Sequence, residues 1–488
     1  MITKRFSILL LFILTLRCTI PNEPKGPSWD IQLNHIPLLK GDTLILSKEL
    51  KGQDVIVGSD SVLTLFATGE SPFTIDDNLY TPPESLSVSI INPALNSRVR
   101  SQFQLSGSQI TISSASILSG NIDIEYRNNA SVPVTVTVEI PGLTKGSTPF
   151  SSVQYLYKGG SASVTSKLDG WLVSLPGGSL PITAEVFGSF LPDSIRDFIN
   201  IKLRLSKQEY SDVTANITTS KPFPSTQIQG FKDPPNVLQN IHLNQAILIL
   251  TFNNFPFSLN PLDITLQSQK KSSIIRIPVR ATIPANSVTN VRLDNNGVNN
   301  NGATPTVVDM ANQLPQQFTM SGDIGIRGTN SRLVRGTNYK IQYSLAIPFD
   351  FSAPNSTIEE VKELNLDKDA RDAIKNQLIR AEMTGEIVNA TSFNGSVSLM
   401  VGPDTASLNT VLIWNDLLPA TLNSSGVVIT PRIFTMQTVL DKTKLNQLLE
   451  AKYYKVQIHL EVNHGKIRAN DYIIIRKVYL AGIGKIEL

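Results

Sequence analysis

The stretch GNIDIEYRNNASVPVTVTVEI, residues 120–140, contains the pattern on which the fold prediction depends. Apolar and polar residues alternate up to an asparagine pair, and they alternate again after Pro133. Alternation with a period of two is typical of a β-strand with one buried face. Asparagine tolerates left-handed backbone, and proline fixes φ and has no N–H to donate, so both favour a corner between strands. We therefore expect a β-hairpin with a wide corner that asparagine stabilises.

Similar stretches occur twice more, in QAILILTFNNFPFSLNPLDITL (residues 245–266) and RAEMTGEIVNATSFNGSVSLMV (residues 380–401). The corner asparagines, Asn128, Asn253 and Asn389, follow each other at intervals of roughly domain size, which predicts two or three similar modules. The third stretch has no proline in its corner and is the copy least expected to belong. The alternative is that asparagine and proline corners are common between strands and the likeness is chance.

The rest of the chain reads as short alternating strands separated by Gly, Pro and Asn turns, so we predict a mainly β protein. The expected architecture is two or three antiparallel β-sandwich or barrel-like modules, with one or two amphipathic helices packed on a sheet. Pro-rich and polar breaks place the boundaries. The expected units are an N-terminal β unit over 31–85, then modules over 86–235, 236–338 and 339–488.

Two segments of the last unit have helical periodicity. Residues 366–380 carry an apolar stripe that includes Leu366, Ile374 and Leu378, with charged residues opposite. The second segment, near 441–453, begins at Asp441 and carries leucines on one face. Both helices are expected to pack on a sheet, and a membrane-lying or partner-binding role for the first is the alternative.

The N-terminus has the features of an export signal. Lys4 and Arg5 precede an apolar run over residues 6–16, which is too short for a bilayer helix of about 20 residues and suits a signal peptide. Cys18, the only cysteine of the chain, follows directly. We therefore expect a signal peptide over 1–17, lipid attachment at Cys18 and a Pro/Gly-rich tether over 18–30. A plain secretory signal with an incidental cysteine is the alternative.

A lone cysteine after such a run resembles the acylation site of bacterial lipoproteins, although Arg17 stands where that motif has a small residue. The segments GPSWDIQLNHIPLL (residues 26–39) and LAIPFDF (residues 345–351) resemble a group of uncharacterised bacterial cell-envelope lipoproteins with repeated β modules. The corner pattern is also similar to type-2 late-embryogenesis-abundant β-sandwich domains. The resemblance implies an envelope location and a lipid anchor, with the membrane face open; it implies no activity.

Composition and motifs point away from catalysis. Net charge is +3 over 488 residues, and no basic patch of the kind that binds nucleic acid is visible. The four histidines and single cysteine form no zinc pattern, and no Gly-x-Ser-x-Gly elbow or phosphate loop occurs. We predict no catalytic, cofactor or metal residues. Asp123 and Glu125 share a strand face, and the loop over 294–304 holds oxygen ligands, but exposed strand acids and a polar hairpin tip are the ordinary explanations.

These observations favour a non-enzymatic, lipid-anchored cell-envelope protein with a scaffold or binding role. Its partners would be the membrane, through the N-terminal lipid, and either an envelope protein or an apolar, lipid-like ligand held between sheet and helix. The alternative is a surface carbohydrate-binding protein or glycoside hydrolase, which would need an aromatic platform or a carboxylate pair. Trp171 and Trp414 lie among apolar residues and are expected in the core.

Overall fold

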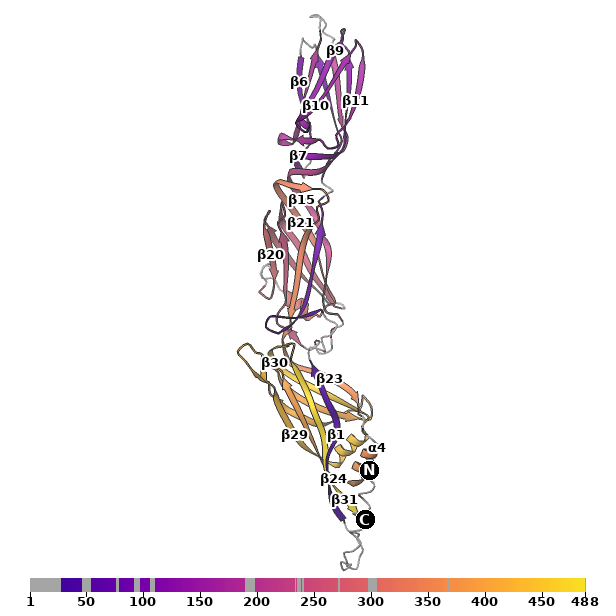
Figure 1. The fold of residues 1–488 in the computed structure, drawn as a ribbon, viewed down its shortest axis with the longest axis vertical. Helices are drawn as coiled ribbons and strands as arrows, with labels where there is room; N and C mark the ends of the chain where they lie inside the picture. Colours follow the sequence, from indigo (N-terminus) through magenta and orange to yellow (C-terminus); the bar gives the residue numbers. More distant parts are fainter. Residues whose placement is uncertain are drawn as a thin grey trace, which may run out of the picture.

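The protein is an elongated stack of three β-sandwich modules (Figure 1). The computed structural model describes residues 28–45, 54–75, 79–91, 97–105, 110–188, 198–232, 234, 238, 241–270, 273–296, 305–364, 366 and 368–487. We call the modules basal (28–45, 242–243 and 350–487), central (54–81 and the rest of 208–348) and distal (84–205). The first and last described strands lie together in the basal module, at one end of the stack (Figure 1).

The distal module is a sandwich of a four-stranded sheet, ordered β11-β8-β14-β5, on part of a larger sheet that contains β10, β9, β13 and β6. Its elements are β5 (Glu84–Ile91), β6 (Ser97–Gln104), β7 (Ile110–Ser119), β8 (Asn121–Asn128), β9 (Val134–Lys145), β10 (Thr148–Leu156), β11 (Ser161–Lys167), β12 (Leu172–Ser174), η2 (Pro176–Gly178), β13 (Ser179–Phe187) and β14 (Phe198–Leu205).

The central module packs the sheet β2-β3-β22-β17-β20 on the strands β19-β18-β21-β15. Its elements are β2 (Val55–Val57), β3 (Leu63–Phe73), β4 (Tyr80–Thr81), β15 (Gln208–Gln229), β17 (Ile247–Asn253), β18 (Ser258–Lys270), β19 (Ser273–Ile283), β20 (Val288–Leu293), α3 (Val307–Asn312), β21 (Gln317–Val334) and β22 (Tyr339–Pro348). Because β15 also pairs with β7, the central and distal modules share one continuous sheet.

The basal module packs β1-β31-β24-β29 on β16-β23-β30-β25-β26. Its elements are β1 (Ser28–Ile45), β16 (His242–Leu243), β23 (Asp350–Glu363), α4 (Lys368–Gln377), β24 (Leu378–Ala390), β25 (Asn394–Gly402), β26 (Asn409–Leu417), β27 (Thr421–Leu422), β28 (Val428–Thr430), β29 (Arg432–Leu440), α5 (Lys442–Glu450), β30 (Tyr453–Lys466) and β31 (Tyr472–Glu487).

The three modules repeat one topology. If the eight main strands of each module are counted along the chain, one sheet has the order sixth, third, eighth, first, and the other has the order fifth, fourth, seventh, second. The strands that correspond are β5, β6, β8, β9, β10, β11, β13 and β14 in the distal module; β3, β15, β17, β18, β19, β20, β21 and β22 in the central; and β1, β23, β24, β25, β26, β29, β30 and β31 in the basal. Each asparagine corner joins the third and fourth strands of its module.

The modules are nested rather than consecutive. The first strand of the basal module, β1, pairs with the last strand, β31, and everything between β1 and β23 builds the other two modules. In the same way the whole distal module lies between β3 and β15 of the central module. Each module is thus inserted in the connection between the first and second strands of the module below it.

Nesting corrects the expected boundaries. Residues 31–85 form no unit of their own, because β1 belongs to the basal module and β3 pairs with β22 of the central one. The segment 86–235 spans two modules, since β15 extends the sheet of the central module. The boundary expected near 339 also falls inside the central module, where β22 completes a sheet. The sandwich class and the mainly β composition were correctly predicted.

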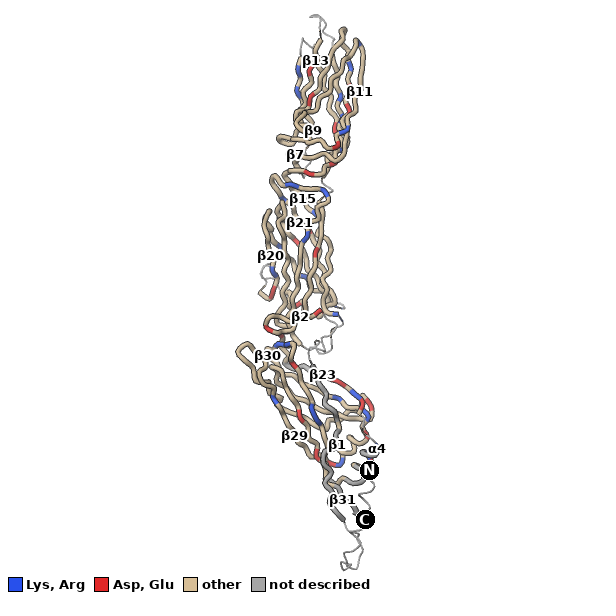
Figure 2. Tube along the Cα trace, viewed as in Figure 1, with Lys and Arg blue, Asp and Glu red and all other residues tan. Residues whose placement is uncertain are grey.

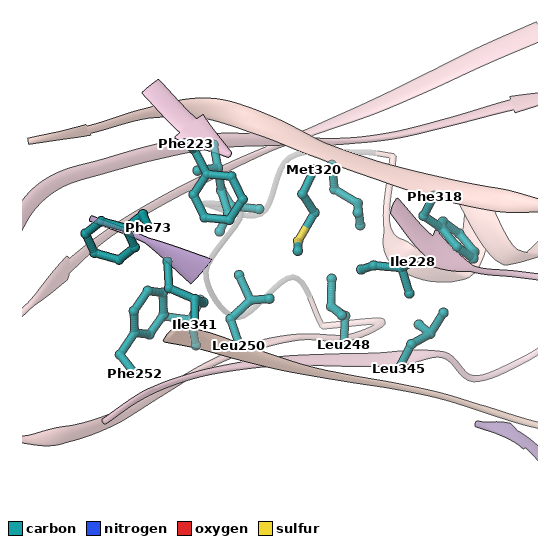
Figure 3. Close-up of a cluster of buried hydrophobic side chains, with 14 of the residues drawn as sticks. Phe73, Phe223, Ile228, Leu248, Leu250, Phe252, Phe318, Met320, Ile341 and Leu345 are labelled. Carbon is teal, nitrogen blue, oxygen red and sulfur yellow. The ribbon is translucent and has the colours of Figure 1, made fainter. Parts of the chain in front are cut away.

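The core of each sandwich comes from the inward residues of alternating strands. Figure 3 shows this for the central module, where side chains from opposed sheets meet. Leu248, Leu250 and Phe252 of β17 are fully buried. Leu248 and Leu250 face Met320 of β21 across the sandwich, and Phe252 lies on the side of Phe223 (Figure 3). Burial of each such side chain contributes about 1.5–3 kcal/mol.

The corners are arches that cross from one sheet to the other, which corrects the expected hairpin. β8 and β9 lie in opposite sheets, as do β17 and β18, and β24 and β25. The alternation on both sides of the corner is that of two strands facing each other across a core, and this is the same pattern that a hairpin would show.

The first and third corners are held by a buried asparagine. The Asn128 side-chain amide donates to the carbonyls of Val132 (2.8 Å) and Tyr157 (3.0 Å), and its oxygen accepts from the Ala130 N–H (2.8 Å). Asn389 makes the same set of hydrogen bonds. Its amide donates to the carbonyls of Phe393 (3.1 Å) and Leu418 (2.8 Å), and its oxygen accepts from the Thr391 N–H (3.0 Å). Both asparagines are 0% exposed.

The second corner is built differently. Asn253 is exposed and bonds the side chain of Gln342 (3.1 Å), while Asn254 adopts a positive φ of 47°. Phe255 and Phe257 instead pack into the core, with rings 5.7 Å apart. The expectation that the third copy fits least is therefore wrong: the third matches the first, and aromatic packing replaces the buried amide in the second.

The helices expected in the last unit are present as α4 and α5. Ile374 of α4 and Leu445, Leu448 and Leu449 of α5 are buried, so these helices pack inward. Asp441 caps α5 by accepting the Lys444 N–H at 2.8 Å. Leu378 is not part of the helical stripe, because β24 begins there. None of the helices in the described part of the chain is both long and apolar enough to cross a bilayer.

Candidate binding surface on the distal module

The outer face of the sheet β11-β8-β14-β5 is polar and ordered in rows. One row joins Ser161, Arg127, Asn200 and Ser89, and the next joins Ser163, Glu125, Lys202 and Ser87. A third joins Thr165, Asp123, Arg204 and Ser85. The rows arise because outward residues of neighbouring strands lie directly opposite each other, while the alternate residues enter the core. We call this set of side chains the polar face.

Neighbouring side chains of the polar face hold each other in place. The Ser89 hydroxyl donates to Asn200 Oδ1 at 2.7 Å, and the Thr165 hydroxyl donates to Asp123 Oδ1 at 2.6 Å. Arg204 lies 3.6 Å from Glu125, and both side chains are half exposed. Charges of both signs are therefore interleaved here, as they are along the whole molecule (Figure 2).

Part of the polar face is hollowed. A depression of about 810 Å³ lies over the first two rows, between the serines of the edge strands and the larger side chains of the central strands. Hydroxyl, amide and charged groups form more of its lining than apolar groups do, so it offers hydrogen bonds to a polar ligand. A second hollow, of about 720 Å³ in the central module, is lined largely by glutamines such as Gln229, Gln267 and Gln316.

The other sheet of the distal module carries exposed apolar side chains. Val153 and Tyr155 lie on the outer face of β10, and Tyr157 follows just beyond its end; their exposures are 57%, 58% and 73%. The rings of the two tyrosines meet edge to face, with centroids 5.2 Å apart. Tyr155 also shares a row with Thr135 of β9 and Phe187 of β13, and Phe187 is 41% exposed.

The structure places some of the residues named in the sequence analysis, and others lie outside the described part of the chain. Cys18, the signal segment and most of the tether lie outside the described residues, as does most of the 294–304 loop. Asp123 and Glu125 do share the polar face, where each has a side-chain partner. Trp414 is buried as expected, and Trp171 is partly buried against Phe150 with ring centroids 5.6 Å apart. In the described part of the chain, no three His, Cys, Asp or Glu residues come together as metal ligands.

Sequence reasoning missed both surfaces of the distal module. The β10 segment had a readable signal, because Val153, Tyr155 and Tyr157 alternate through a stretch that holds no charged residue. The polar face had none, because the rows form only when β5, β8, β11 and β14 are placed side by side. Neither hollow is lined like the apolar cavity that was expected between sheet and helix.

Comparison with known proteins adds no function. No protein-family description and no curated protein matches the chain. Among solved structures, a putative secreted protein from Parabacteroides distasonis is 13% identical, with a TM-score of 0.38 over 55% of this chain and 89% of that one. A tandem CBM22 domain of Paenibacillus barcinonensis Xyn10C is 9% identical, with a TM-score of 0.14 over 82% of this chain and 98% of that one. These likenesses are too distant to carry an argument.

Proposed function

We propose that this protein is a non-enzymatic, lipid-anchored component of the bacterial cell envelope that acts as a scaffold, a rod that carries its distal module away from the membrane. One observation carries the proposal: the strand that follows the tether, β1, pairs along its length with the C-terminal strand β31 in the basal module, at the end of the stack opposite the distal module (Figure 1). An anchor at Cys18 would thus hold the basal end at the bilayer and leave the distal module farthest from it.

The nested topology supports the role of a rod, because more than one stretch of chain crosses each junction between modules. At the lower junction three segments exchange backbone hydrogen bonds in a ring: Leu63 N–H to the Ile467 carbonyl (2.9 Å), Ile467 N–H to Phe349 (2.9 Å) and Phe349 N–H to Leu63 (2.8 Å). Bending the stack there would break several of these bonds together.

The upper junction is held by an arginine and by the shared sheet. Arg335 donates to the carbonyls of Tyr210 and Leu79, each at 2.8 Å, and so connects the two crossing stretches. The hydroxyls of Tyr210 and Thr81 are hydrogen bonded at 2.9 Å in a buried position. β15, paired with both β7 and β21, continues the sheet across the junction.

The anchor is tested by the Cys18→Ala variant. Wild type should incorporate labelled palmitate and sediment with membranes, and the variant should do neither. A wild type that takes up no label would overturn the anchor while leaving the rod itself untouched.

The reach of the rod is tested separately on vesicles that carry the lipidated protein. The lipid would occupy the thiol of Cys18, the one natural cysteine, so it would not react with a dye. A cysteine introduced at Ser163 in the distal module, or at Thr443 in the basal α5, then gives a single labelling site. A probe on Thr443→Cys should transfer energy to a lipid dye efficiently, and one on Ser163→Cys should transfer little. Equal transfer from both positions would contradict an upright rod.

A second candidate function is carbohydrate binding at the polar face, favoured by the hollow lined with hydroxyl, amide and charged groups. We propose no hydrolysis there, because Asp123 and Glu125 are neighbours on one strand with partners of their own rather than groups facing each other across a cleft. On a glycan array, Lys202→Ala should lose binding that Lys340→Ala in the central module retains. Absence of binding by the wild type would exclude this candidate.

The apolar-ligand version of the role stays a prediction. Solvent extraction of the purified protein followed by mass spectrometry would test it. Recovery of a stoichiometric lipid would support a carrier, and a lipid-free protein would leave the scaffold role alone.

A further inference from the structure

We propose that the distal module binds a second copy of this chain by antiparallel pairing of β10 with β10. β10 is an edge strand: among the described residues it pairs with β9 and with no other strand. The N–H and C=O groups on its other side therefore form a row that another strand can complete.

β10 has one feature that opposes pairing, Pro149 near its first residue, and it lacks the other features that protect the equivalent strands of the other modules. In the central module, β19 carries Arg276, Pro278 and Arg280, and proline and charge both oppose pairing with a further strand. In the basal module, β26 has two register shifts against β25, and Asp416 lies there at a positive φ of 59°. The same edge of the repeated topology is thus blocked by charge, proline or irregular pairing in two modules, and in the distal module it is open beyond Pro149.

The same contrast holds across the rest of the molecule. Every other described edge strand longer than three residues carries at least one charged side chain. β10, with the sequence TPFSSVQYL, carries none. Two copies can therefore meet along β10 without placing like charges opposite each other, which is the usual barrier to such contact.

The outward side chains of β10 are complementary to themselves when one copy is reversed. With Val153 on the two-fold axis, Tyr155 of one copy lies opposite Ser151 of the other, and Tyr157 lies opposite Pro149. Each exposed aromatic ring is then placed across from a small residue. The contact is isologous, as in most homodimers, and joins β6-β13-β9-β10 of both copies in one continuous sheet.

Antiparallel pairing also determines how the two rods point. The strands of the distal module run roughly along the long axis of the stack (Figure 1), so reversing β10 reverses the whole molecule. The basal ends then lie at opposite ends of the pair. If these ends carry the lipid proposed above, the dimer bridges two membranes; the pairing of β10 itself does not depend on the anchor.

The register is tested by crosslinking the full chain with Cys18→Ala, which leaves no natural thiol. Val153→Cys places two cysteines opposite each other, where Cα atoms of antiparallel strands are about 4.5–5.5 Å apart and a disulfide can form. Mild oxidation should give a covalent dimer. Ser151→Cys and Thr165→Cys are matched controls that should give no covalent dimer, because their cysteines do not meet across the axis, and equal crosslinking of all three would overturn the register.

The interface is tested by Val153→Lys, which puts two like charges at the axis. Sedimentation should show dimerisation weakened roughly tenfold or more, with Thr165→Lys on the edge strand β11 as the matched control. Circular dichroism of each variant checks its folding. A wild type that remains monomeric at every concentration, whether or not it captures another protein, would overturn self-pairing.

The proposal that the dimer bridges two membranes is tested with vesicles that carry the lipidated protein. Wild type should cluster them, and Val153→Lys should not. Dimers in solution without clustering would overturn the bridging orientation and retain the β10 contact, so a failure of the anchor and a failure of the pairing are distinguishable.

Discussion

At the scale of single residues, two buried asparagines occupy core positions of the kind that hydrophobic side chains fill elsewhere in the sandwich. Asn128 and Asn389 lie where the chain turns from one sheet to the other and exposes backbone groups inside the core. A side-chain amide supplies both donors and an acceptor there, so the buried corner keeps its hydrogen bonds.

Replacing Asn128 by alanine should therefore destabilise the distal module by about 2–4 kcal/mol, because buried carbonyls lose their donors. Hydrogen exchange of the β8 and β9 amides would measure the loss. Asn253→Ala at the exposed second corner is the matched control and should change stability by less than about 0.5 kcal/mol. Equal effects at both corners would contradict the structural difference between them.

Asp471 predicts a pH dependence. Its carboxyl is buried in the turn between β30 and β31, and burial raises its pKa to about 6, although the Arg468 N–H donates to it at 2.8 Å. Folding therefore favours the neutral acid. The stability this group contributes is full below about pH 4 and is lost as pH rises through about 6, a difference of roughly 3 kcal/mol.

The Asp471→Asn variant removes this titration and keeps an acceptor for Arg468. Urea unfolding between pH 4 and pH 8 should show wild type losing stability relative to the variant as pH rises. Parallel pH profiles for the two proteins would contradict the raised pKa.

At the scale of elements, each strand edge and helix end has its own local requirement. α5 begins at Asp441, whose carboxylate accepts the Lys444 N–H and so satisfies one of the free N–H groups of the first turn. The residues that follow bury Leu445, Leu448 and Leu449 against the basal module. The cap and the buried stripe together determine where this helix starts and which face it packs.

Asp441→Ala should cost about 1 kcal/mol of helix stability, and Asp441→Asn, which can still accept the bond, should cost little. Hydrogen exchange at the α5 amides would measure both. A loss of the same size in the two variants would show that charge rather than the cap bond is responsible.

At the scale of the whole molecule, nesting makes the distal module removable. Thr81 and Gln208, where the chain enters and leaves it, are paired across β4 and β15, so they are separated by only one strand spacing. Replacing residues 84–205 by a short glycine linker should leave a folded protein that is shorter by one module. Small-angle scattering would show a reduced maximum dimension, and an aggregated product would contradict the independence of the two lower modules.

The sequence by itself determined the elements of this protein. Alternation marked the strands, helical spacing and Asp441 marked α5, and asparagine marked three corners that prove to be topologically equivalent. These features are local, because a period of two or of 3.6 depends on which face of a single element is buried.

Only the tertiary structure decided which strands pair. Many strands here share the same alternation of apolar and polar residues, so the sequence pattern does not tell which strand pairs with which. The partner of a residue can be only a few positions away, or more than four hundred positions away, as Glu487 is from Ser28. The choice follows from filling a common core, a property of the assembled sheets. For that reason the arches, the nesting of the modules, the rows of the polar face and the open edge of β10 appear only once the chain is folded.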